Sequence, residues 1–495
     1  MGKKLFGGAS NGRYANNEPV SIMDEPEESP RRQNREDRPA RTEAAQKQER
    51  PEKTKAQRAA KAEPAEPGKK TKKSPKPHKG LRVAAWLLSI LLFLESAYCV
   101  VIFTDLIPPL SALRSIYIDT AMVTMTHQYL ATALIPGDIV MDVVHKTQQA
   151  KEEQQGVVSG WEDLPPVTEP EQVKSPSSGF SKEAAATMLN QLAQDLGLSS
   201  GEDEFFELFH ELDEASVHAY VEDHPEVISA GWDKFEVNKA HVGDEGTEMM
   251  TKQGDQVLAV DAANGLLAIR VKGSTYKGVL ILGKDPSRLK CASAASRNVG
   301  QRVGEIAQAN NALVGMTGSG FEDLPGQPEG SHQTGASMCS GETRGTHDWG
   351  VKRIELHRDN RLYVMDSNSP FSADCTDATE WTPALIVDGV DVSGRDNQYT
   401  AMNPRTCLGQ TKDEAIMFLG IEGRKLDSMG CNAAECAKIL MRYGGYQAMN
   451  VDGGTSAMLW YKGAPVMRCS NANIPEGRRL PNAWVYCAEP VPDPA

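Results

Sequence analysis

The stretch that decides the fold is Ile416–Gly454, IMFLGIEGRKLDSMGCNAAECAKILMRYGGYQAMNVDGG. It opens with an uninterrupted apolar run at 416–421, which is typical of a strand buried on both faces. A helix is expected next over 432–443, with an asparagine as its N-cap and two glycines as its stop. A second strand follows at 448–451 and ends at Asp452. Strand, helix and strand in this order predict a crossover unit of an α/β fold.

Both strands end in a carboxylate, Glu422 and Asp452, which glycine follows at once. In α/β sheets, ligands bind in the crevice outside the carboxyl ends of strands. Arg405, in NPRTCLGQ just before the first strand, supplies a guanidinium that can clamp a phosphate. Such a set fits a glycosyl phosphate: one carboxylate attacks, or activates water, at the anomeric carbon, and the arginine holds the departing phosphate. The alternative is structural, with Glu422 paired to Arg424, Asp452 in a turn and Arg405 in an ion pair.

Charge is distributed unevenly along the 495 residues, whose formal net charge is −14. Residues 1–80 hold about 20 Lys+Arg against about 12 Asp+Glu, roughly +8, which leaves roughly −22 for the rest. The acidic remainder argues against a nucleic-acid-binding protein. Residues 1–80, the N-terminal arm, contain too few large aliphatic residues for apolar burial to offset the chain entropy, so we expect this arm to be disordered. Its basic cluster at 69–79 is either a solvated tail or a tether to anionic lipid.

Residues Val83–Phe103, VAAWLLSILLFLESAYCVVIF, form an apolar run that Glu95 alone interrupts with an acidic group. A helix of this length spans about 31 Å, which matches the hydrocarbon core of a bilayer. A cleaved signal peptide is the competing interpretation. The charged and polar arm at 1–80, and the length of the apolar run itself, argue against it. We expect a single-pass signal anchor in the cell membrane, with a cytoplasmic N-terminus and an extracellular C-terminal part.

The rest of the chain divides by composition and periodicity. We expect a membrane-proximal helix at 104–146, a linker at 147–179, a helical subdomain at 180–240, a β-meander at 246–290 and an α/β domain after it. The predicted fold class is α/β (mixed α+β). A mixed β-sheet core with crossover helices follows the disordered arm, one transmembrane helix and the small helical subdomain.

Six short motifs stand in order over about 180 residues of the C-terminal half. They are GMTGSGFED (315–323), ALIVDG (384–389), NPRTCLGQ (403–410), GIEGR (420–424), NVDGGTSAM (450–458) and RLPNAWVY (479–486). From about Ala309 to Ala488 the chain thus resembles the phosphodiester glycosidase domain, the family of the mammalian lysosomal uncovering enzyme and of bacterial envelope proteins of exopolysaccharide biosynthesis. The resemblance implies a domain at 291–488 that hydrolyses sugar-1-phosphodiester bonds, such as those of GlcNAc, in cell-envelope or exopolysaccharide glycans.

The resemblance also implies residue roles. Asp452 is the first choice for a catalytic carboxylate and Glu422 the second, with Arg405 on the phosphate. The implied substrate-binding residues are Asn450, Gly453, Gly454, Ser456, Arg424, Thr406, Asn482, Thr317 and Gly318. Three positions depart from the family pattern: Thr317 replaces Asn, Glu422 replaces Asp and Thr455 replaces Gly. Thr317 and Thr455 favour an alternative function, a catalytically weak glycan-binding or assembly protein of the cell envelope.

Eight of the nine cysteines follow the apolar run, an even number that suits disulfides outside the cytoplasm. Their connectivity is not readable from the sequence, although Cys431 and Cys436 are close enough to pair locally or to stay free. The chain has no CxxC pair and no HExxH, which argues against a zinc site. We predict no metal and no cofactor. The expected partners are a glycan or glycosyl-phosphodiester substrate and the membrane, and not nucleic acid.

Overall fold

In the computed structural model the described residues are 79–124, 128–161, 201–347, 350–394 and 399–492. The predicted arm at 1–80 lies outside them except for its last two residues. Parts of the predicted linker and helical subdomain, at 162–200, also lie outside. The helices are α1 (Lys79–Phe103), α2 (Pro108–Met122), α3 (Tyr129–Thr132), α4 (Gly137–Glu153), α6 (Gly201–Leu208), α7 (Glu214–Asp223), α8 (Val303–Ala309) and α9 (Ala433–Arg442).

Three β-sheets form the C-terminal part, and every strand pairing within them is antiparallel. The first has nine strands in the order β1 (Glu236–Asn238), β2 (Gln256–Asp261), β3 (Leu266–Lys272), β4 (Lys277–Gly283), β15 (Ile416–Ile421), β14 (Arg405–Thr411), β16 (Gly445–Asn450), β12 (Ala384–Val387) and β13 (Val390–Asp391). The second is β10 (Leu362–Asp366), β9 (Lys352–His357), β11 (Cys375–Trp381), β7 (Ser337–Cys339) and β8 (Glu342–Arg344). The third is β18 (Ala464–Pro465), β17 (Leu459–Tyr461), β6 (Ala312–Thr317), β19 (Asn482–Cys487) and β5 (Leu289–Ser293). The predicted mixed α+β class is confirmed.

The predicted crossover unit is present at the centre of the nine-stranded sheet. β15 and β16 both pair antiparallel with β14, which lies between them, so they run in the same direction. α9 connects the two strands, and its N-cap is Asn432, whose side chain accepts from the Glu435 backbone N–H at 2.9 Å. The ends of β15 and β16 and the start of β14 therefore lie at one edge of the sheet.

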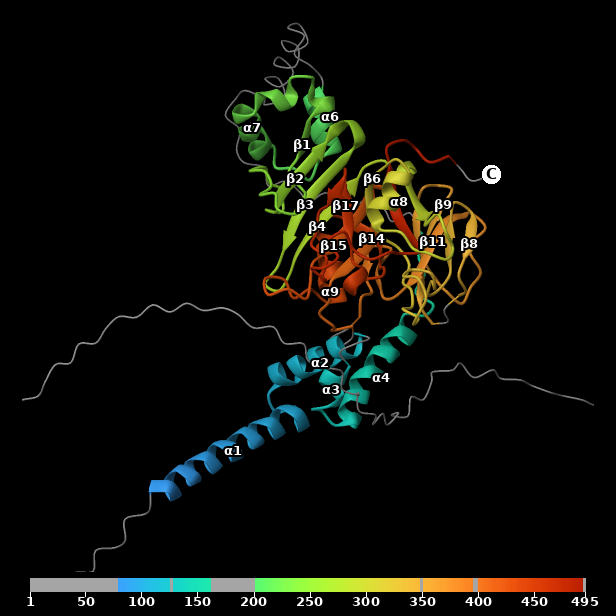
Figure 1. Ribbon diagram of the computed structural model, residues 1–495. Coiled ribbons are helices and arrows are strands. Elements are labelled where there is room, and N and C mark those ends of the chain that lie inside the picture. The colour runs from blue at the N-terminus through green and yellow to red at the C-terminus, as the bar shows by residue number, and fades with distance from the viewer. Residues whose placement is uncertain (1–78, 125–127, 162–200, 348–349, 395–398, 493–495) are drawn as a thin grey trace, which may run out of the picture. The chain divides into compact units, whose positions relative to one another are not determined.

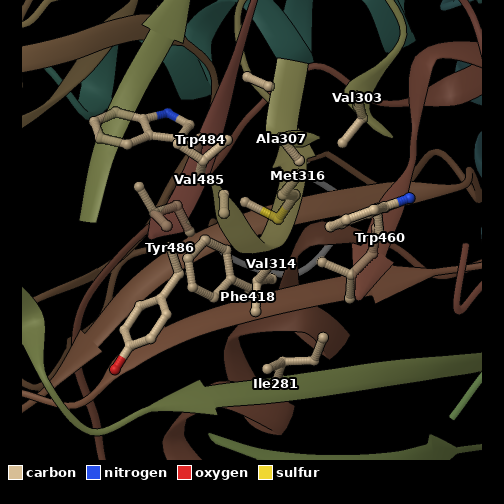
Figure 2. Packing of buried hydrophobic residues seen from close by; sticks show 14 of the residues in the cluster. Ile281, Val303, Ala307, Val314, Met316, Phe418, Trp460, Trp484, Val485 and Tyr486 are labelled. Carbon is tan, nitrogen blue, oxygen red and sulfur yellow. The ribbon is translucent and has the colours of Figure 1, made fainter. Parts of the chain in front are cut away.

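β15 explains why its sequence is apolar at every position. All six of its residues are buried. Ile416 and Phe418 belong to a core shared with the third sheet and α8, whereas Met417, Leu419 and Ile421 face a second core that α9 and α6 cover. Because side chains alternate along a strand, a strand covered on both faces needs apolar residues throughout. Figure 2 shows Phe418 in the same packed cluster as Met316 and Trp484 of the third sheet.

The predicted meander is part of the central sheet. Within the β-meander expected at 246–290, the structure has the strands β2, β3 and β4. β4 pairs along its whole length with β15, from Ile416 opposite Gly283 to Ile421 opposite Gly278. Figure 1 shows the green strands β2 to β4 in the same sheet as β15, which lies next to β4. The predicted boundary at 290/291 therefore falls within continuous structure, because the edge of β4 supplies the hydrogen bonds that β15 needs.

The membrane-proximal part differs from the single helix expected at 104–146. Its described residues form three helices, α2, α3 and α4, and Pro136 and Gly137 separate α3 from α4. The predicted linker at 147–179 begins as the last turns of α4 and continues as a segment that bonds to the C-terminal part. There Gln154 donates to the carbonyls of Ala384 and Val392 at 3.1 and 2.6 Å and accepts from the Ala384 N–H at 3.2 Å.

Within the part of the chain that the structure describes, α1 is the one helix long and apolar enough to cross a membrane. Its mean hydropathy reaches 2.2, and it contains all of the predicted span at 83–103. The first residues of α2 are Pro108 and Pro109, which separate α2 from α1.

All nine cysteines, each of them in the described residues, are free thiols. Two pairs lie close together, with Sγ–Sγ distances of 3.2 Å for Cys291 and Cys339 and 3.2 Å for Cys431 and Cys436. Of the two outcomes that the sequence allows for Cys431 and Cys436, the structure therefore has the free thiols. Burial raises the pKa of the Cys407 thiol well above its ordinary value, which argues against Cys407 as a nucleophile.

Candidate active site

Three loops converge at the edge where β15 and β16 end. The Gly454 N–H donates to the Pro404 carbonyl at 3.0 Å. A Cβ on Gly453 would lie 2.8 Å from that same oxygen, and one on Gly423 would lie 2.5 Å from the Pro404 nitrogen. The glycines that follow the two carboxylates are therefore needed because the backbones of the three loops touch one another. Gly454 also has a left-handed φ of +61°, which favours glycine.

Asp452 lies directly after β16, in the turn that leads into a short 3₁₀ helix at Gly454–Ser456. Its Oδ1 accepts from the Gly453 N–H at 2.9 Å, and the Ser456 side chain also hydrogen-bonds to it. The residue as a whole is partly exposed, whereas its carboxyl is shielded from solvent. Loss of solvent around the carboxyl raises its pKa to about 6, and the negative charge of Asp323 adds to this, against the opposing hydrogen bonds and the charge of Arg478. A carboxyl in this range can exchange its proton near neutral pH.

Glu422 lies at the same edge, but its carboxylate is fully engaged. Oε1 accepts from the Arg468 backbone N–H at 2.7 Å, and Oε2 accepts from Arg468 Nε and Nη2 at 2.8 and 2.5 Å. Only 8% of the residue is exposed. The hydrogen bond to Glu422 is the largest cause of the raised pKa of the Arg468 guanidinium. The structural alternative paired Glu422 with Arg424, which is wrong: the partner is Arg468.

The backbone of Arg405 and the guanidinium group of Arg424 lie beside the Asp452 turn. Arg405 is held by backbone carbonyls, with Nη2 donating to Ala401 at 2.8 Å and Nε to Cys431 at 3.3 Å. Arg424 donates from Nη1 to Thr455 Oγ1 and from Nη2 to Asn403 Oδ1, both at 3.1 Å. Its pKa is lowered, first by loss of solvent and second by the charge of Arg405. The two cations repel each other, and a phosphate between them would relieve that repulsion.

Several implied sugar-binding residues are instead buried and internally bonded. The Thr317 hydroxyl donates to the Ser456 carbonyl at 2.7 Å and accepts from the Met458 N–H at 3.0 Å. The Thr406 hydroxyl donates to the Asp452 carbonyl. Both hydroxyls are therefore bonded to the backbone of the segment 452–458.

Two asparagines act in the same way. Asn482 is fully buried, and its Oδ1 accepts from the Ser319 N–H at 2.7 Å while its Nδ2 donates to Ser319 Oγ at 3.0 Å. Asn450 donates from Nδ2 to the Thr382 carbonyl at 2.9 Å. The Asp452 turn thus contacts Arg424 through Thr455 and lies against Pro404, the residue before Arg405, whereas the two asparagines bond to neighbouring loops.

The sequence interpretation missed Arg478 as a neighbour of Asp452. Arg478 stacks over the Phe321 ring, with 4.3 Å from its guanidinium carbon to the ring centroid. It forms ion pairs with Asp323 and, at 2.5 Å, with Glu329. Phe321 and Asp323 belong to the first of the six motifs, so that motif could have pointed to them, but no spacing pattern marks Arg478. Among the described residues, no group of three or more His, Cys, Asp or Glu side chains is arranged to hold a metal.

Gly318 links the first motif to the Asp452 turn, since its carbonyl accepts from the Asp452 N–H at 3.3 Å. A Cβ at Gly318 would lie 2.1 Å from Asn482 Oδ1, which is buried and already bonded. We expect Gly318→Ala to lower the free energy of unfolding by about 1–3 kcal/mol through overpacking. Chemical denaturation of the purified chain measures this. Gly137→Ala, at a site with no atom within 4 Å, is the control and should lose nothing; equal stability of the two variants would contradict the expectation.

Residues 310–487 match the family model described as phosphodiester glycosidase. No curated protein matches the chain. Among solved structures, the zebrafish N-acetylglucosamine-1-phosphodiester alpha-N-acetylglucosaminidase catalytic domain, auto-inhibited by its pro-peptide, is 16% identical with a TM-score of 0.38. The match covers 45% of this chain and 82% of that one. A hypothetical protein from Synechocystis is 13% identical with a TM-score of 0.33, over 47% of this chain and 63% of that one. The family resemblance that the motifs predict is thus confirmed: the chain carries a phosphodiester glycosidase domain.

Proposed function

We propose that the chain hydrolyses sugar-1-phosphodiester bonds, with GlcNAc phosphodiesters as the model substrates. The family match supports a glycosidase of this type. The observation that carries the proposal is the Asp452 turn: the pKa of Asp452 is raised to about 6, and Arg424, which the charge of Arg405 repels, donates to Thr455 of the same turn at 3.1 Å. A carboxylate can act on the anomeric carbon, and two cations can stabilise the charge of a departing phosphate.

In the proposed reaction, ionised Asp452 acts on the anomeric carbon either directly or by taking a proton from the attacking water. The bond between that carbon and the phosphate oxygen breaks, and its electron pair leaves with the phosphate monoester. Water supplies the new hydroxyl of the sugar. Arg405 and Arg424 stabilise the charge on the leaving phosphate. Because a phosphate monoester is a good leaving group, a strong general acid matters less than in ordinary glycosidases.

We also propose that α1 is a signal anchor and that the domain acts outside the cell membrane on envelope or exopolysaccharide glycans. The length and hydropathy of α1 support this. Its low burial does so too, because only 6% of its most apolar stretch is buried against the rest of the protein. A buried core helix would show the opposite. The basic arm before α1 fits the cytoplasmic side under the positive-inside rule.

A catalytically weak glycan-binding or assembly protein is the second candidate function. The engagement of Glu422 by Arg468 favours it, because only one of the two predicted carboxylates is then available for chemistry. Release of free GlcNAc from methyl GlcNAc-α-1-phosphodiester by the full chain in lipid nanodiscs separates the two. We expect turnover; binding of the compound without turnover would favour the second function.

Removing the Arg424 guanidinium should weaken the phosphate site. We expect Arg424→Met to lower kcat/KM for the same phosphodiester by about 10–100-fold, the value of one or two hydrogen bonds to a charged group. The matched control is Arg361→Met, which removes an arginine paired with Glu414 at 2.9 Å outside the site. Equal kcat/KM for both variants would exclude Arg424 from phosphate binding.

A further inference from the structure

A cavity of about 470 Å³ opens beside the candidate active site. Most of its wall is carbon and sulfur, contributed by Val242, Pro465, Met467, Cys469, Ala472 and Pro475. Met467 and Cys469 form a buried floor, whereas Val242 and Ala472 are exposed at the rim. Its volume falls in the range of sites for small organic ligands, and its lining is predominantly apolar, as such sites usually are.

Two contacts join this cavity to the Asp452 turn. Cys469 Sγ lies 3.6 Å from the carbonyl of Thr455, which is in the turn itself. Thr455 in turn accepts from Arg424 at 3.1 Å, and Lys425 of the cavity wall is the next residue along the chain. The cavity and the proposed phosphate site therefore share one wall.

Among the described residues, the charged side chains that line the cavity are paired with an opposite charge, except for Lys425. Arg468 is neutralised by Glu422 and Asp427, at 2.5 and 3.0 Å. The Glu476 carboxylate points to Arg302, 3.7 Å away. His241 Nε2 is hydrogen-bonded to the Tyr461 carbonyl at 3.0 Å. Within the described ranges, the Lys425 ammonium has neither an ion pair nor a hydrogen bond, so it is available to an anion at the mouth of the cavity.

We propose that this cavity is the aglycone subsite and that it takes an apolar aglycone. The proposal rests on the proposed function, because it places the aglycone side of the phosphodiester here. The phosphodiester would lie between Arg424 and Lys425, the sugar toward Asp452 and the apolar group against Met467 and Cys469. A sugar as aglycone would need many hydrogen-bonding partners, and three of the four polar side chains of the lining are already bonded within the protein, whereas an apolar group gains from leaving water.

Two compounds that differ only in the aglycone test the proposal: benzyl and methyl GlcNAc-α-1-phosphodiester. Their dissociation constants are measured by calorimetry on full-length Asp452→Asn in nanodiscs, so binding is observed without turnover. We expect the benzyl compound to bind at least about tenfold more tightly, because the ring leaves water. Val242→Asp, added to this background, should bring the ratio close to one by placing a charge at the rim. Val390→Asp makes the same change at an exposed valine of β13 outside the cavity and should keep the preference.

Equal affinities for the two compounds would overturn the assignment, as would loss of the preference in both aspartate variants. Hydrolysis of the methyl compound by the wild-type chain is measured in parallel, and this separates the two proposals. Normal hydrolysis with equal affinities would overturn the aglycone subsite alone. Absence of hydrolysis with a clear benzyl preference would keep the subsite and overturn the enzyme. If neither compound is bound or hydrolysed, both proposals fail.

Discussion

Asp452→Asn removes the hydrolytic activity and leaves a folded protein. We expect kcat/KM for methyl GlcNAc-α-1-phosphodiester to fall by at least about 10³-fold, since the amide can neither attack nor accept a proton from water. The Asn side chain can still accept from the Gly453 N–H, so the turn should keep its shape. Free GlcNAc release by full-length wild-type and variant chains, at matched concentrations, measures the effect. Turnover within tenfold of wild type would contradict the role of Asp452.

The same substitution should stabilise the protein at neutral pH. The pKa of Asp452 is about 6 in the folded chain against an ordinary 3.8, so the folded state favours the protonated form. The penalty is absent below about pH 4, grows as pH rises through the interval between the two values and is complete above pH 6, where it reaches about 3 kcal/mol. Asp452→Asn should therefore gain up to that amount at pH 7.5 and nothing at pH 4 in chemical denaturation. A loss of stability at pH 7.5 would contradict the burial argument.

Asp377 provides a matched control. Burial also raises its pKa to about 6, and its Oδ1 accepts from the backbone N–H groups of Ser340 and Cys291 at 2.7 and 3.0 Å. Asparagine keeps that acceptor, so Asp377→Asn should give a stability gain of the same sign. Asp377 lies on β11, outside the Asp452 turn. The hydrolytic activity of Asp377→Asn should therefore stay within about twofold of wild type. This control separates relief of a buried charge from loss of a catalytic group.

Arg468→Met should destabilise the fold strongly, because it leaves the Glu422 carboxylate charged, buried and without its main partner. Breaking a fully buried pair costs about 3–5 kcal/mol, and we expect about 2–3 kcal/mol here since a third of the Arg468 side chain is exposed. Chemical denaturation at pH 7 measures the loss. The second variant, Arg468→Met with Glu422→Gln, should recover most of it because the buried group is then neutral.

The control for Arg468 is again Arg361→Met, whose partner Glu414 is exposed, and this variant should change stability by less than about 1 kcal/mol. If Arg468→Met is as stable as the control, or if the double variant recovers nothing, Glu422 is not held as a structural ion pair. Glu422 would then return as a candidate for chemistry beside Asp452.

The centre of the fold could be predicted from the sequence because its signals are local. The apolar run of β15, the Asn432 cap of α9 and the carboxylate after β16 each depend on a few neighbouring residues. Two buried strands joined by one helix leave few topologies, and this places Glu422 and Asp452 at one edge. The expected convergence of Arg405 with them follows from β14, which lies between the two strands.

The uses of individual side chains could not be predicted, because they depend on residues far away in the chain. Glu422 and Arg468 are separated by 46 positions, and no periodicity connects them. Thr317 and Asn482 carry polar groups that suit a sugar, yet strand pairing buries both and gives their bonds to the backbone of other loops. Gln154 falls in the predicted linker at 147–179. Its burial follows from its hydrogen bonds to the carbonyls of Ala384 and Val392, which are more than 200 positions away.

The dependence of kcat/KM on pH tests the central claim most directly, since it reports the ionisation of the free enzyme's essential group. With Asp452 acting in its ionised form and a pKa of about 6, kcat/KM for methyl GlcNAc-α-1-phosphodiester should be flat above pH 7. It should fall about tenfold for each pH unit well below 6. A profile that stays flat from pH 4.5 to pH 8, or one that rises as the pH falls, would contradict Asp452 as the catalytic carboxylate.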